Sequence, residues 1–568
     1  MMIRSLLLFF CAASLAGAQQ SAPPPQMSPD AAPSSLHSTI RFDDANASSG
    51  IHFIHSFGSA RLGSLLEGTG AGCLWFDYNH SGRESLFVVN GQTLLPDMTP
   101  NPLKAKPNPP PRAHLYRNDG NGHFTDVTAE SGLDPDMYGI AVTAADYDND
   151  GYEDLLVTGY GKVVLYHNDG NGHFTDVAAK AGIKVNGWAI SSTWLDYDKD
   201  GCVDLFVGRY VKFDPAYRAY YAADNYPGPL DYAGETNQLF HNNCNGTFTD
   251  VSDKSGISAY IGRTMGVTAA DFDNDGWDDI YVTNDSTQNF LFHNEHNGTF
   301  KEIGNETGSA YGQNGEATSS MGPVAADFWN RGVLDLWVTD GSYNRFLENS
   351  GAPASGSSDP KSEWKGFDDV TAAGGISQTD AQYVSWGSGV YDFDNDGILD
   401  ILVFHGGLIH MIPQEHTLFR GLGNGKFRDV SEQAGSVLNT RTVARGACFA
   451  DYDNDGKVDA YVVNLGSEGT LLHNVSTGTG RWVEINLVGT KSNRDGIGAR
   501  IEIVAGGKRQ SAERVASSGY LSQNDARVHF GLGAATIIDK LVVRWPSGIV
   551  QTLVNQPVDR VLTVEEPK

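Results

Sequence analysis

Four aspartates recur at a fixed spacing five times along the chain. The first copy, DYDNDGYEDLLV, begins at Asp146 and has aspartate at its first, third, fifth and ninth places and glycine at its sixth. Glycine permits a sharp turn there, so carboxylates at alternate positions can converge on one point. Such a cage of hard oxygen ligands suits Ca²⁺. We therefore predict about five Ca²⁺ sites. Their predicted ligands are Asp146, Asp148, Asp150, Asp154, Asp196, Asp198, Asp200, Asp204, Asp271, Asp273, Asp275, Asp279, Asp392, Asp394, Asp396, Asp400, Asp451, Asp453, Asp455 and Asp459.

Two other interpretations of these loops are weaker. An EF-hand loop needs a glutamate at its twelfth place and flanking helices. Here the twelfth place is a valine that suits a buried strand, which excludes the EF-hand. Turn-capping is the second alternative, but one aspartate per turn would serve it, and four would repel each other without a cation. The valines are Val88, Val157, Val207, Val282, Val338, Val403 and Val462.

Two incomplete copies of the loop bring the number of units to seven. The copy at Asp77 keeps oxygen ligands at Asn79 and Ser81, so a sixth Ca²⁺ site could form there. The copy at Asp327 has Arg331 at its fifth place, and we expect no metal there. We predict instead that this guanidinium occupies the position of the ion and pairs with Asp327 and Asp335.

A second repeated motif alternates with the aspartate loops. LYHNDGNGHFTDV, which begins at Leu165, joins an apolar-aromatic pair to an Asn/Gly turn and an alternating strand, which predicts a β-hairpin. One unit is then a strand, the aspartate loop, a second strand and the hairpin. Seven such units predict an all-β fold, a seven-bladed β-propeller. The seventh unit stops at Asn474, and a matching strand occurs at Phe42–Ile51, so we expect the N-terminal strand to complete the last blade.

Composition and the N-terminal residues indicate the classes of partner, the domain limits and the location of the protein. A net charge of −29 argues against binding to nucleic acid. Residues 1–18 have a short positive start, an apolar run and a small-residue cleavage site, which predicts a signal peptide rather than a membrane anchor. No later stretch is apolar enough to cross a membrane. We expect a Pro/Ser-rich linker over 19–39, the propeller over 40–478 and a separate domain over 479–568. The protein would be secreted, or periplasmic or at the cell surface if bacterial.

Four cysteines follow the predicted signal peptide. Cys202 and Cys244 lie in two turns of the third unit, so they could form a disulfide, and two free thiols are the alternative. For Cys73 and Cys448, on first strands, we predict buried free thiols.

The alternation of DxDxDGxxD with LFxNxGxGxFTDV resembles the FG-GAP or VCBS repeat of integrin α-subunit propellers. The tail, NRDGIGARIEIVAGGKRQSAERVASSGYLSQNDARVHFGLG followed by LVVRWPSGIVQTL, is similar to the ASPIC/UnbV domain. Together with the signal peptide, this combination resembles the cartilage acidic protein family and its bacterial relatives. The resemblance implies a Ca²⁺-binding propeller, a small β-rich C-terminal domain, and an extracellular binding role without established catalysis.

Two functions follow from this sequence. The first is a secreted, calcium-stabilised binding or adhesion module for an extracellular protein or glycan, with a tyrosine-rich loop at 209–240 as a contact surface. The second is a carbohydrate-active enzyme of the lyase or dehydratase type, in which His405, His410 or His416 would meet an arginine or a further metal in the channel. No Ser/His/Asp or paired-carboxylate spacing supports catalysis, so we name no catalytic residue and favour the binding module.

Overall fold

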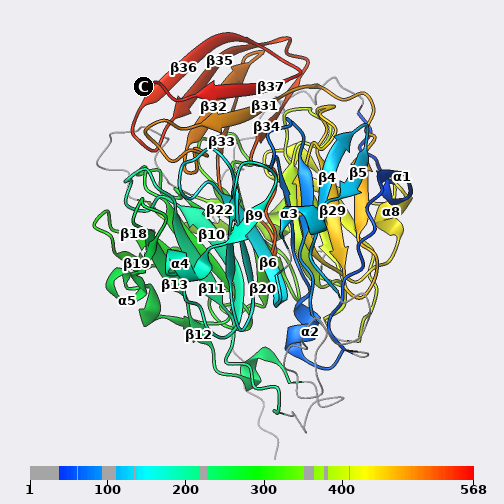
Figure 1. The fold of residues 1–568 in the computed structure, drawn as a ribbon. Helices are drawn as coiled ribbons and strands as arrows, with labels where there is room; N and C mark the ends of the chain where they lie inside the picture. The colour runs from blue at the N-terminus through cyan, green and yellow to red at the C-terminus, as the bar shows by residue number, and fades with distance from the viewer. Residues whose placement is uncertain are drawn as a thin grey trace, which may run out of the picture. The chain divides into compact units, whose positions relative to one another are not determined.

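The computed structural model describes residues 38–59, 62–92, 111–133, 135–217, 227–350, 364–376, 381–408 and 410–568 (Figure 1). The predicted signal peptide, 1–18, lies outside these ranges, as does nearly all of the predicted linker. Within the described residues, no helix has the length and apolar character that a membrane span requires.

Seven four-stranded antiparallel sheets follow one another along the described chain, and we number them as blades. Blades one to three are β2 (Cys73–Phe76), β3 (Ser85–Val88), β4 (His114–Gly120) and β5 (His123–Asp126); β6 (Tyr138–Ala145), β7 (Asp154–Tyr160), β8 (Val164–Asn168) and β9 (Phe174–Asp176); and β10 (Ala189–Leu195), β11 (Asp204–Arg209), β13 (Gln238–Asn242) and β14 (Phe248–Asp250). Blades four and five are β16 (Thr264–Ala270), β17 (Asp279–Asn284), β18 (Phe290–Asn294) and β19 (Phe300–Glu302); and β20 (Ser320–Ala326), β21 (Asp335–Asp340), β22 (Arg345–Asn349) and β23 (Phe367–Asp369). Blades six and seven are β24 (Ser385–Tyr391), β25 (Asp400–His405), β26 (Thr417–Gly423) and β27 (Lys426–Asp429); and β28 (Ala444–Ala450), β29 (Asp459–Asn464), β30 (Thr470–Asn474) and β1 (Phe42–Asp44).

The first strands of the blades form a ring. Each contacts the first strand of the next blade, and β28 of the seventh contacts β2 of the first. This arrangement confirms the predicted all-β, propeller-type fold, and we interpret the seven sheets as its blades. The seventh sheet is completed by the N-terminal strand as predicted, because Phe42 of β1 pairs with Asn474 of β30. Closure of the ring in this way completes the seventh sheet, so that each blade leaves only a short outer edge strand.

Each aspartate loop connects the first strand of a blade to the second. The ninth-place aspartate begins the second strand, as Asp154 begins β7 and Asp279 begins β17. The apolar run that follows it is buried on both faces, because blades pack against blades on either side. All aspartate loops therefore lie at one end of the ring, which we call the loop face.

The hairpin motifs form the third and fourth strands of the blades, as predicted. The asparagine that ends the third strand donates through Nδ2 to a backbone carbonyl in the aspartate loop of the preceding blade, which binds neighbouring blades together. Blade six has Gly421 at this place and has no such side chain. The bonds are Asn118 to Tyr452, Asn168 to Tyr78, Asn242 to Tyr147, Asn294 to Tyr197, Asn349 to Phe272 and Asn474 to Phe393.

Several one-turn helices, which the sequence analysis did not predict, follow the fourth strands. Five of them end at a glycine with positive φ, for example Gly132 at 77°, where a residue with a side chain would be strained. They are α1 (Asn46–Ser49), α3 (Thr128–Ser131), α4 (Ala178–Ala181), α5 (Ser252–Ser255) and α6 (Thr371–Gly374). The remaining short elements are α2 (Leu65–Thr69), α8 (Ser436–Asn439), η2 (Pro229–Asp231), η3 (Ile257–Ala259), and the paired strands β12 (Glu235–Thr236) and β15 (Ile261–Gly262).

The C-terminal residues form two further sheets around their own apolar core, which includes Val483, Ile501 and Trp545. Figure 1 shows this part in orange and red at the loop face. The first sheet is β31 (Arg481–Val488), β34 (Val528–Gly533) and β37 (Val561–Glu565). The second is β32 (Arg500–Ala505), β33 (Lys508–Glu513), β35 (Ile537–Arg544) and β36 (Val550–Pro557).

The connection between β33 and β34, residues 514–527, runs into the ring of first strands, and we call it the channel segment. Its backbone bonds to four blades: Val142 N–H donates to Leu521, Gln523 N–H to Cys73, Gly519 N–H to Pro323 and Asp525 N–H to Phe449. The contact is close, because a Cβ added at Gly72 would lie 1.8 Å from the Leu521 carbonyl oxygen.

Tyr520 is the largest side chain of the channel segment and is fully buried. Its ring lies 5.1 Å from that of Trp386 on blade six. Its hydroxyl donates to the Thr69 carbonyl oxygen at 3.2 Å. The channel of this propeller is therefore filled by the chain itself.

Candidate metal centres

The turn of each complete aspartate loop is formed by its own hydrogen bonds. In blade two, the Asp146 carboxylate accepts from the N–H of Asp150 at 3.0 Å and of Gly151 at 2.7 Å. Asn149 and Gly151 both have positive φ, 59° and 99°, which explains the glycine at the sixth place. The first-place carboxylates Asp196, Asp392 and Asp451 accept the equivalent pair of bonds.

The fold brings the predicted ligands together. In blade two, carboxylate oxygens of Asp146, Asp148 and Asp154 lie within 4.8 Å of one another. Similar groups of three, each with a histidine, form in blades two to four. In blade six, burial and the other three carboxylates of the loop raise the pKa of Asp392. The groups with histidine are Asp148, Asp150 and His167; Asp198, Asp200 and His241; and Asp273, Asp275 and His293.

Burial makes the ionised carboxylates of these loops costly. Burial raises the pKa of Asp154 to about 7 and that of Asp204 to about 8. Burial and the neighbouring Asp495 raise the pKa of Asp146 to about 9. A cation bound among these groups would stabilise their ionised forms.

Unsatisfied oxygens show that the donor set fits a cation. Asp198 Oδ1, Asp271 Oδ1 and Asp394 Oδ1 are buried and have no hydrogen-bond partner within the described residues. Buried carboxylate oxygens normally have partners, and a hard divalent ion supplies one. Ca²⁺ in these loops would be held by the first-, third-, fifth- and ninth-place aspartates, and its chemistry would be to stabilise the fold.

A histidine that the sequence analysis missed borders four of the loops. It is the third residue of the LYHN or LFHN motif, and Nδ1 of His167 lies 3.1 Å from Asp154 Oδ1. The hydrogen bond that His167 donates to Asp154 raises the pKa of His167 to about 9. The sequence contained a signal for these histidines, since histidine recurs at the third place of the hairpin motif, but we interpreted the motif only as a β-hairpin. The other three are His241, His293 and His473, at 3.2, 3.0 and 3.1 Å from their ninth-place aspartates.

Blade six has an arginine at the equivalent position. Arg420 Nη2 lies 2.6 Å from Asp394 and 3.4 Å from Asp396. One guanidinium offsets only part of the charge of four buried carboxylates, so the predicted ligand set of this loop remains strongly acidic.

The two incomplete loops differ from each other. Asp77 accepts from the N–H groups of Ser81 and Gly82, which is the turn of the complete loops. In blade five the prediction for Arg331 is half correct. Its guanidinium pairs with Asp335 at 2.9 Å and with Glu348 at 2.5 Å. Asp327 instead accepts from the backbone N–H of Arg331 and from the hydroxyl of Ser511. The guanidinium is drawn away from Asp327 because Glu348 occupies the place that the histidine has in blades two to four.

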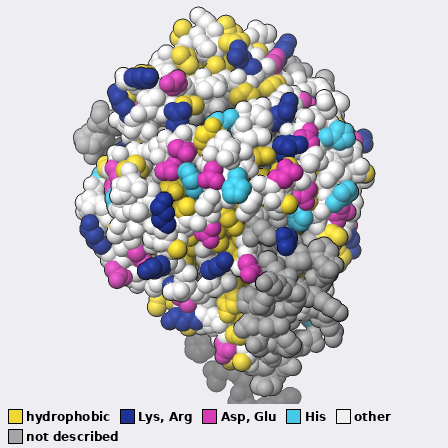
Figure 2. Space-filling model, in the orientation of Figure 1, with side chains coloured by type: hydrophobic (Ala, Val, Ile, Leu, Met, Phe, Trp, Pro, Cys, Tyr) yellow, Lys and Arg dark blue, Asp and Glu magenta, His cyan; other side chains and the backbone are white. Residues whose placement is uncertain are grey.

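The C-terminal domain docks on the fourth residue of four loops. In each of these loops, the Oδ1 atom of an asparagine lies within hydrogen-bond distance of this domain. The Nδ2 atom of the same asparagine donates to the backbone carbonyl oxygen of the sixth-place glycine in the aspartate loop of the next blade. The Oδ1 contacts are Asn149 to Arg494 N–H, Asn274 to Arg500, Asn395 to His529 and Asn454 to Arg527, and the Nδ2 bonds reach Gly201, Gly332, Gly456 and Gly82. The loops are thus a platform for the domain that fills the channel. On the face in Figure 2, acidic and histidine side chains lie side by side below this domain.

For Cys202 and Cys244, the sequence left two alternatives, a disulfide and two free thiols. Cys202 and Cys244 form a disulfide, with 5.8 Å between their Cα atoms. Cys73 and Cys448 are buried and free, as predicted.

The histidines proposed for an enzyme do not form a catalytic group. His405 and His416 are buried, and their ring nitrogens lie within hydrogen-bond distance of the hydroxyls of Ser385, Thr417 and Thr442. Burial lowers the pKa of His416 to about 3. His410 is exposed in the connection between β25 and β26.

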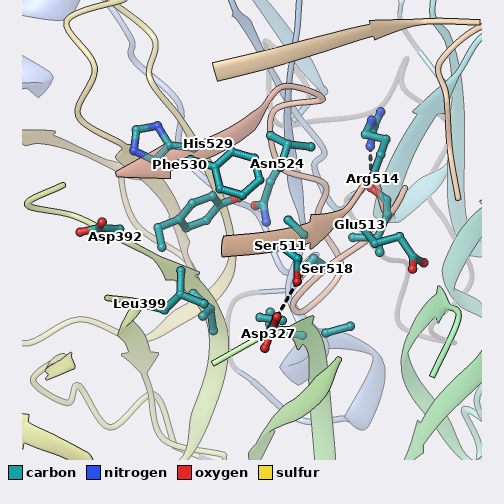
Figure 3. A pocket seen from close by; sticks show the side chains of 18 of the residues that line it. Asp327, Asp392, Leu399, Ser511, Glu513, Arg514, Ser518, Asn524, His529 and Phe530 are labelled. Atoms are coloured by element: carbon teal, nitrogen blue, oxygen red, sulfur yellow. Dashed lines mark hydrogen bonds between the residues drawn. The ribbon is translucent and has the colours of Figure 1, made fainter. Parts of the chain in front are cut away.

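A small cavity of about 140 Å³ lies between blades five and six and the C-terminal domain (Figure 3). Its walls include Leu399 and Phe530, and Ser511 bonds to Asp327 at its edge. The figure shows the Arg514 side chain directed away from Phe530. The surface of this cavity is more apolar than polar, although its lining also includes charged side chains such as Asp392, Glu513 and Arg527.

Comparison with known families identifies the repeat. The model described as "FG-GAP-like repeat" matches residues 77–157, 146–207, 228–282, 271–338 and 392–462, and that described as "ASPIC and UnbV" matches 489–568. The chain belongs to the FG-GAP-like repeat family and carries a C-terminal ASPIC/UnbV domain. The resemblance predicted from the motifs is confirmed. FG-GAP repeats generally bind calcium, and the acidic clusters of this chain could hold a metal.

The curated relatives of this FG-GAP protein include cartilage acidic protein 1. The mouse protein is 26% identical over 335 residues, 56% of this chain and 47% of the relative. The human protein is 25% identical over 333 residues, 56% of this chain and 46% of the relative. The chain thus spans about half the length of the curated relatives it matches.

Two solved structures are also similar. An Agrocybe aegerita lectin structure, whose title describes recognition of non-reducing terminal N-acetylglucosamine, has a TM-score of 0.36 at 14% identity, over 70% of this chain and 86% of the lectin. BBS1N in complex with ARL6DN has a TM-score of 0.39 at 7% identity, over 76% of this chain and 96% of that chain.

Proposed function

We propose that this protein is a secreted, calcium-stabilised binding module whose ligand, an extracellular protein or glycan, contacts the end of the propeller opposite the loop face. The observation that carries this proposal is the channel segment. It fills the place where a propeller enzyme would hold substrate, and the C-terminal domain covers the loop face. The loops at the other end remain for recognition.

Exposed apolar side chains gather at that opposite end. Ile54, Leu230, Ile261, Leu408 and Ile412 are 44–68% exposed, although each is large and apolar. All five lie in connections that enter first strands or leave second strands, away from the aspartate loops. In Figure 1 this end carries α2 and β12. These five exposed side chains, which lie on connections of different blades at one end of the ring, support a binding role for that end.

The contact surface expected of the tyrosine-rich loop stays a prediction, and two of its six tyrosines have a structural place. Tyr210 and Tyr232 are buried beside Trp188 and Phe213, and the Tyr210 hydroxyl bonds to Asp285 at 2.6 Å. These aromatic side chains support the loop from inside and do not form its contact surface. Residues 218–226, with the other tyrosines of its tip, lie outside the described residues.

A matched pair of variants tests the proposed surface. The double change Ile54→Asp and Ile261→Asp should lower binding to glycan arrays or cell surfaces at least tenfold, because it places charge in an apolar contact. Val550→Asp with Val554→Asp is the control, since these apolar residues are also more than half exposed but lie on the C-terminal domain. Equal binding by both double variants would contradict the proposal.

A further inference from the structure

A second cavity lies beneath the C-terminal domain, on the side of blades one, two and seven. Its volume is about 460 Å³. Leu487, Val488 and Val561 of the C-terminal domain form an apolar wall, and Gly82 and Gly151 of two aspartate loops lie opposite. A Cβ added at either glycine would meet no atom within 4 Å, so the space in front of them is open. We call this cavity the vestibule.

Two glutamates face the vestibule from the eighth places of their loops. Glu84 is 6% exposed; its Oε1 lies 3.4 Å from Arg527 Nε, and its Oε2 has no hydrogen-bond partner in the described part of the chain. The Glu153 carboxylate makes neither a hydrogen bond nor an ion pair with any described residue. Buried carboxylate oxygens without donors are rare and costly.

An arginine of the opposite charge faces the same space. Arg514 is 3% exposed, and its Nη1 donates to the Val515 carbonyl oxygen, while its Nη2 has no partner among the described residues. Its backbone is held by bonds to Ala499 and Gly498. Glu84 and Glu153 directly precede the blade strands β3 and β7, and Arg514 belongs to the C-terminal domain, so these charged groups reach the cavity from different elements.

The other charged groups of the vestibule have partners. Asp77 accepts from Ser81 and Gly82, and Asp495 accepts from the N–H of Asp146. Arg494 donates to the Gly489 carbonyl oxygen, and Arg527 pairs with Asp525 and with Glu484. Within the part of the chain that the structure describes, the groups that remain without such partners are Arg514 Nη2, Glu84 Oε2 and the Glu153 carboxylate.

We propose that the vestibule binds a small zwitterion of the α-amino acid class, whose carboxylate pairs with Arg514 and whose ammonium group pairs with Glu84 and Glu153. A planar guanidinium pairs well with a carboxylate, and the two charge-assisted contacts satisfy every unpartnered group named above. The apolar wall favours a side chain of aliphatic type. This site is separate from the surface proposed for extracellular ligands.

Calorimetric titration of the calcium-saturated full chain tests the proposal with L-valine as the probe. Isovalerate and isobutylamine are its matched halves, with the carboxylate alone and the ammonium alone. We expect one molecule of L-valine to bind and each half to bind at least tenfold more weakly. Halves that bind as tightly as L-valine, or no heat with L-valine up to about 10 mM, would overturn the proposal.

Variants locate the site. Arg514→Gln and Glu153→Gln should each weaken L-valine binding at least tenfold, because each removes one charge partner. Thr563→Trp should abolish binding by filling the cavity without changing its charge, which keeps the test informative if Arg514→Gln does not fold. Arg560→Gln, an exposed change on the same domain, should bind normally. The proposal would be overturned if the parent chain did not bind valine and if Glu84→Gln and Glu153→Gln each lost a bound Ca²⁺ or Mn²⁺ ion. That result would identify a cation site instead.

Discussion

In six of the seven blades, an asparagine at or near the end of the third strand links neighbouring blades. Asn294 is fully buried, and its Nδ2 donates to the carbonyl oxygens of Tyr197 at 2.9 Å and Asp278 at 3.3 Å. Because Tyr197 belongs to the preceding blade, one side chain holds two blades in register.

We predict that Asn294→Ala lowers the free energy of unfolding by about 2–4 kcal/mol, since two buried carbonyls lose their donor. Denaturant unfolding of the calcium-loaded protein measures this. Asn314→Ala, on an exposed turn, should change stability by no more than about 0.5 kcal/mol. A similar small change for Asn294→Ala would show that water replaces the donor.

Glu566 gives the C-terminal domain a defined acid sensitivity. Burial by itself would raise the pKa of Glu566, but the Ser547 hydroxyl and the N–H groups of Lys491, Ser492 and Thr490 lower it to about 2. A carboxyl whose folded pKa is depressed stabilises the fold above its unfolded pKa, and the effect is lost as pH falls.

We therefore predict that the domain loses stability from about pH 4.5 to about pH 2, and that Glu566→Gln removes this dependence while lowering stability at pH 7. Thermal melts at a series of pH values measure it. An unchanged pH profile in Glu566→Gln would assign the acid sensitivity to other carboxyls.

Among the structural elements, the aspartate loops have two roles. They connect first and second strands, and through Asn149, Asn274, Asn395 and Asn454 they hold the C-terminal domain. A cation that fixes the loops would therefore also fix the channel segment.

Calcium removal should loosen the channel segment before the blades. We predict that a chelator speeds amide hydrogen exchange over residues 514–527, because the loops that hold their domain lose order. The β35–β36 hairpin is the internal control, since its hydrogen bonds lie within the C-terminal sheet. Faster exchange in the hairpin but not in the channel segment would contradict the coupling.

The loops and hairpins could be predicted because their signals are local and repeated. The position of Asp146, Asp148 and Asp154 follows from spacing alone, and so does the closing strand at Phe42. The channel segment could not be predicted, since Gln523 contacts Cys73 and Ala144 hundreds of residues away. His167 was missed because its partner, Asp154, belongs to another repeated motif.

At the scale of the whole molecule, the two ends of the propeller are unequal. One end is covered by the protein's own C-terminal domain, and the other presents loops with exposed apolar side chains such as Ile54 and Ile261. This asymmetry is the basis of our proposal that ligands are recognised at the end opposite the loop face. Twenty of the 69 acidic residues are the aspartates of the five complete loops, where cations would neutralise their charge.

The calcium content of the mature chain tests this account most directly. Equilibrium dialysis followed by atomic absorption should find about five ions per chain, one for each complete loop, or about six if the Asp77 loop also binds. Asp154→Asn should remove one ion, and Arg331→Gln should leave the count unchanged. A chain that binds no calcium would contradict the assignment of the twenty loop aspartates and, with it, the role of the loops as the platform that closes the channel.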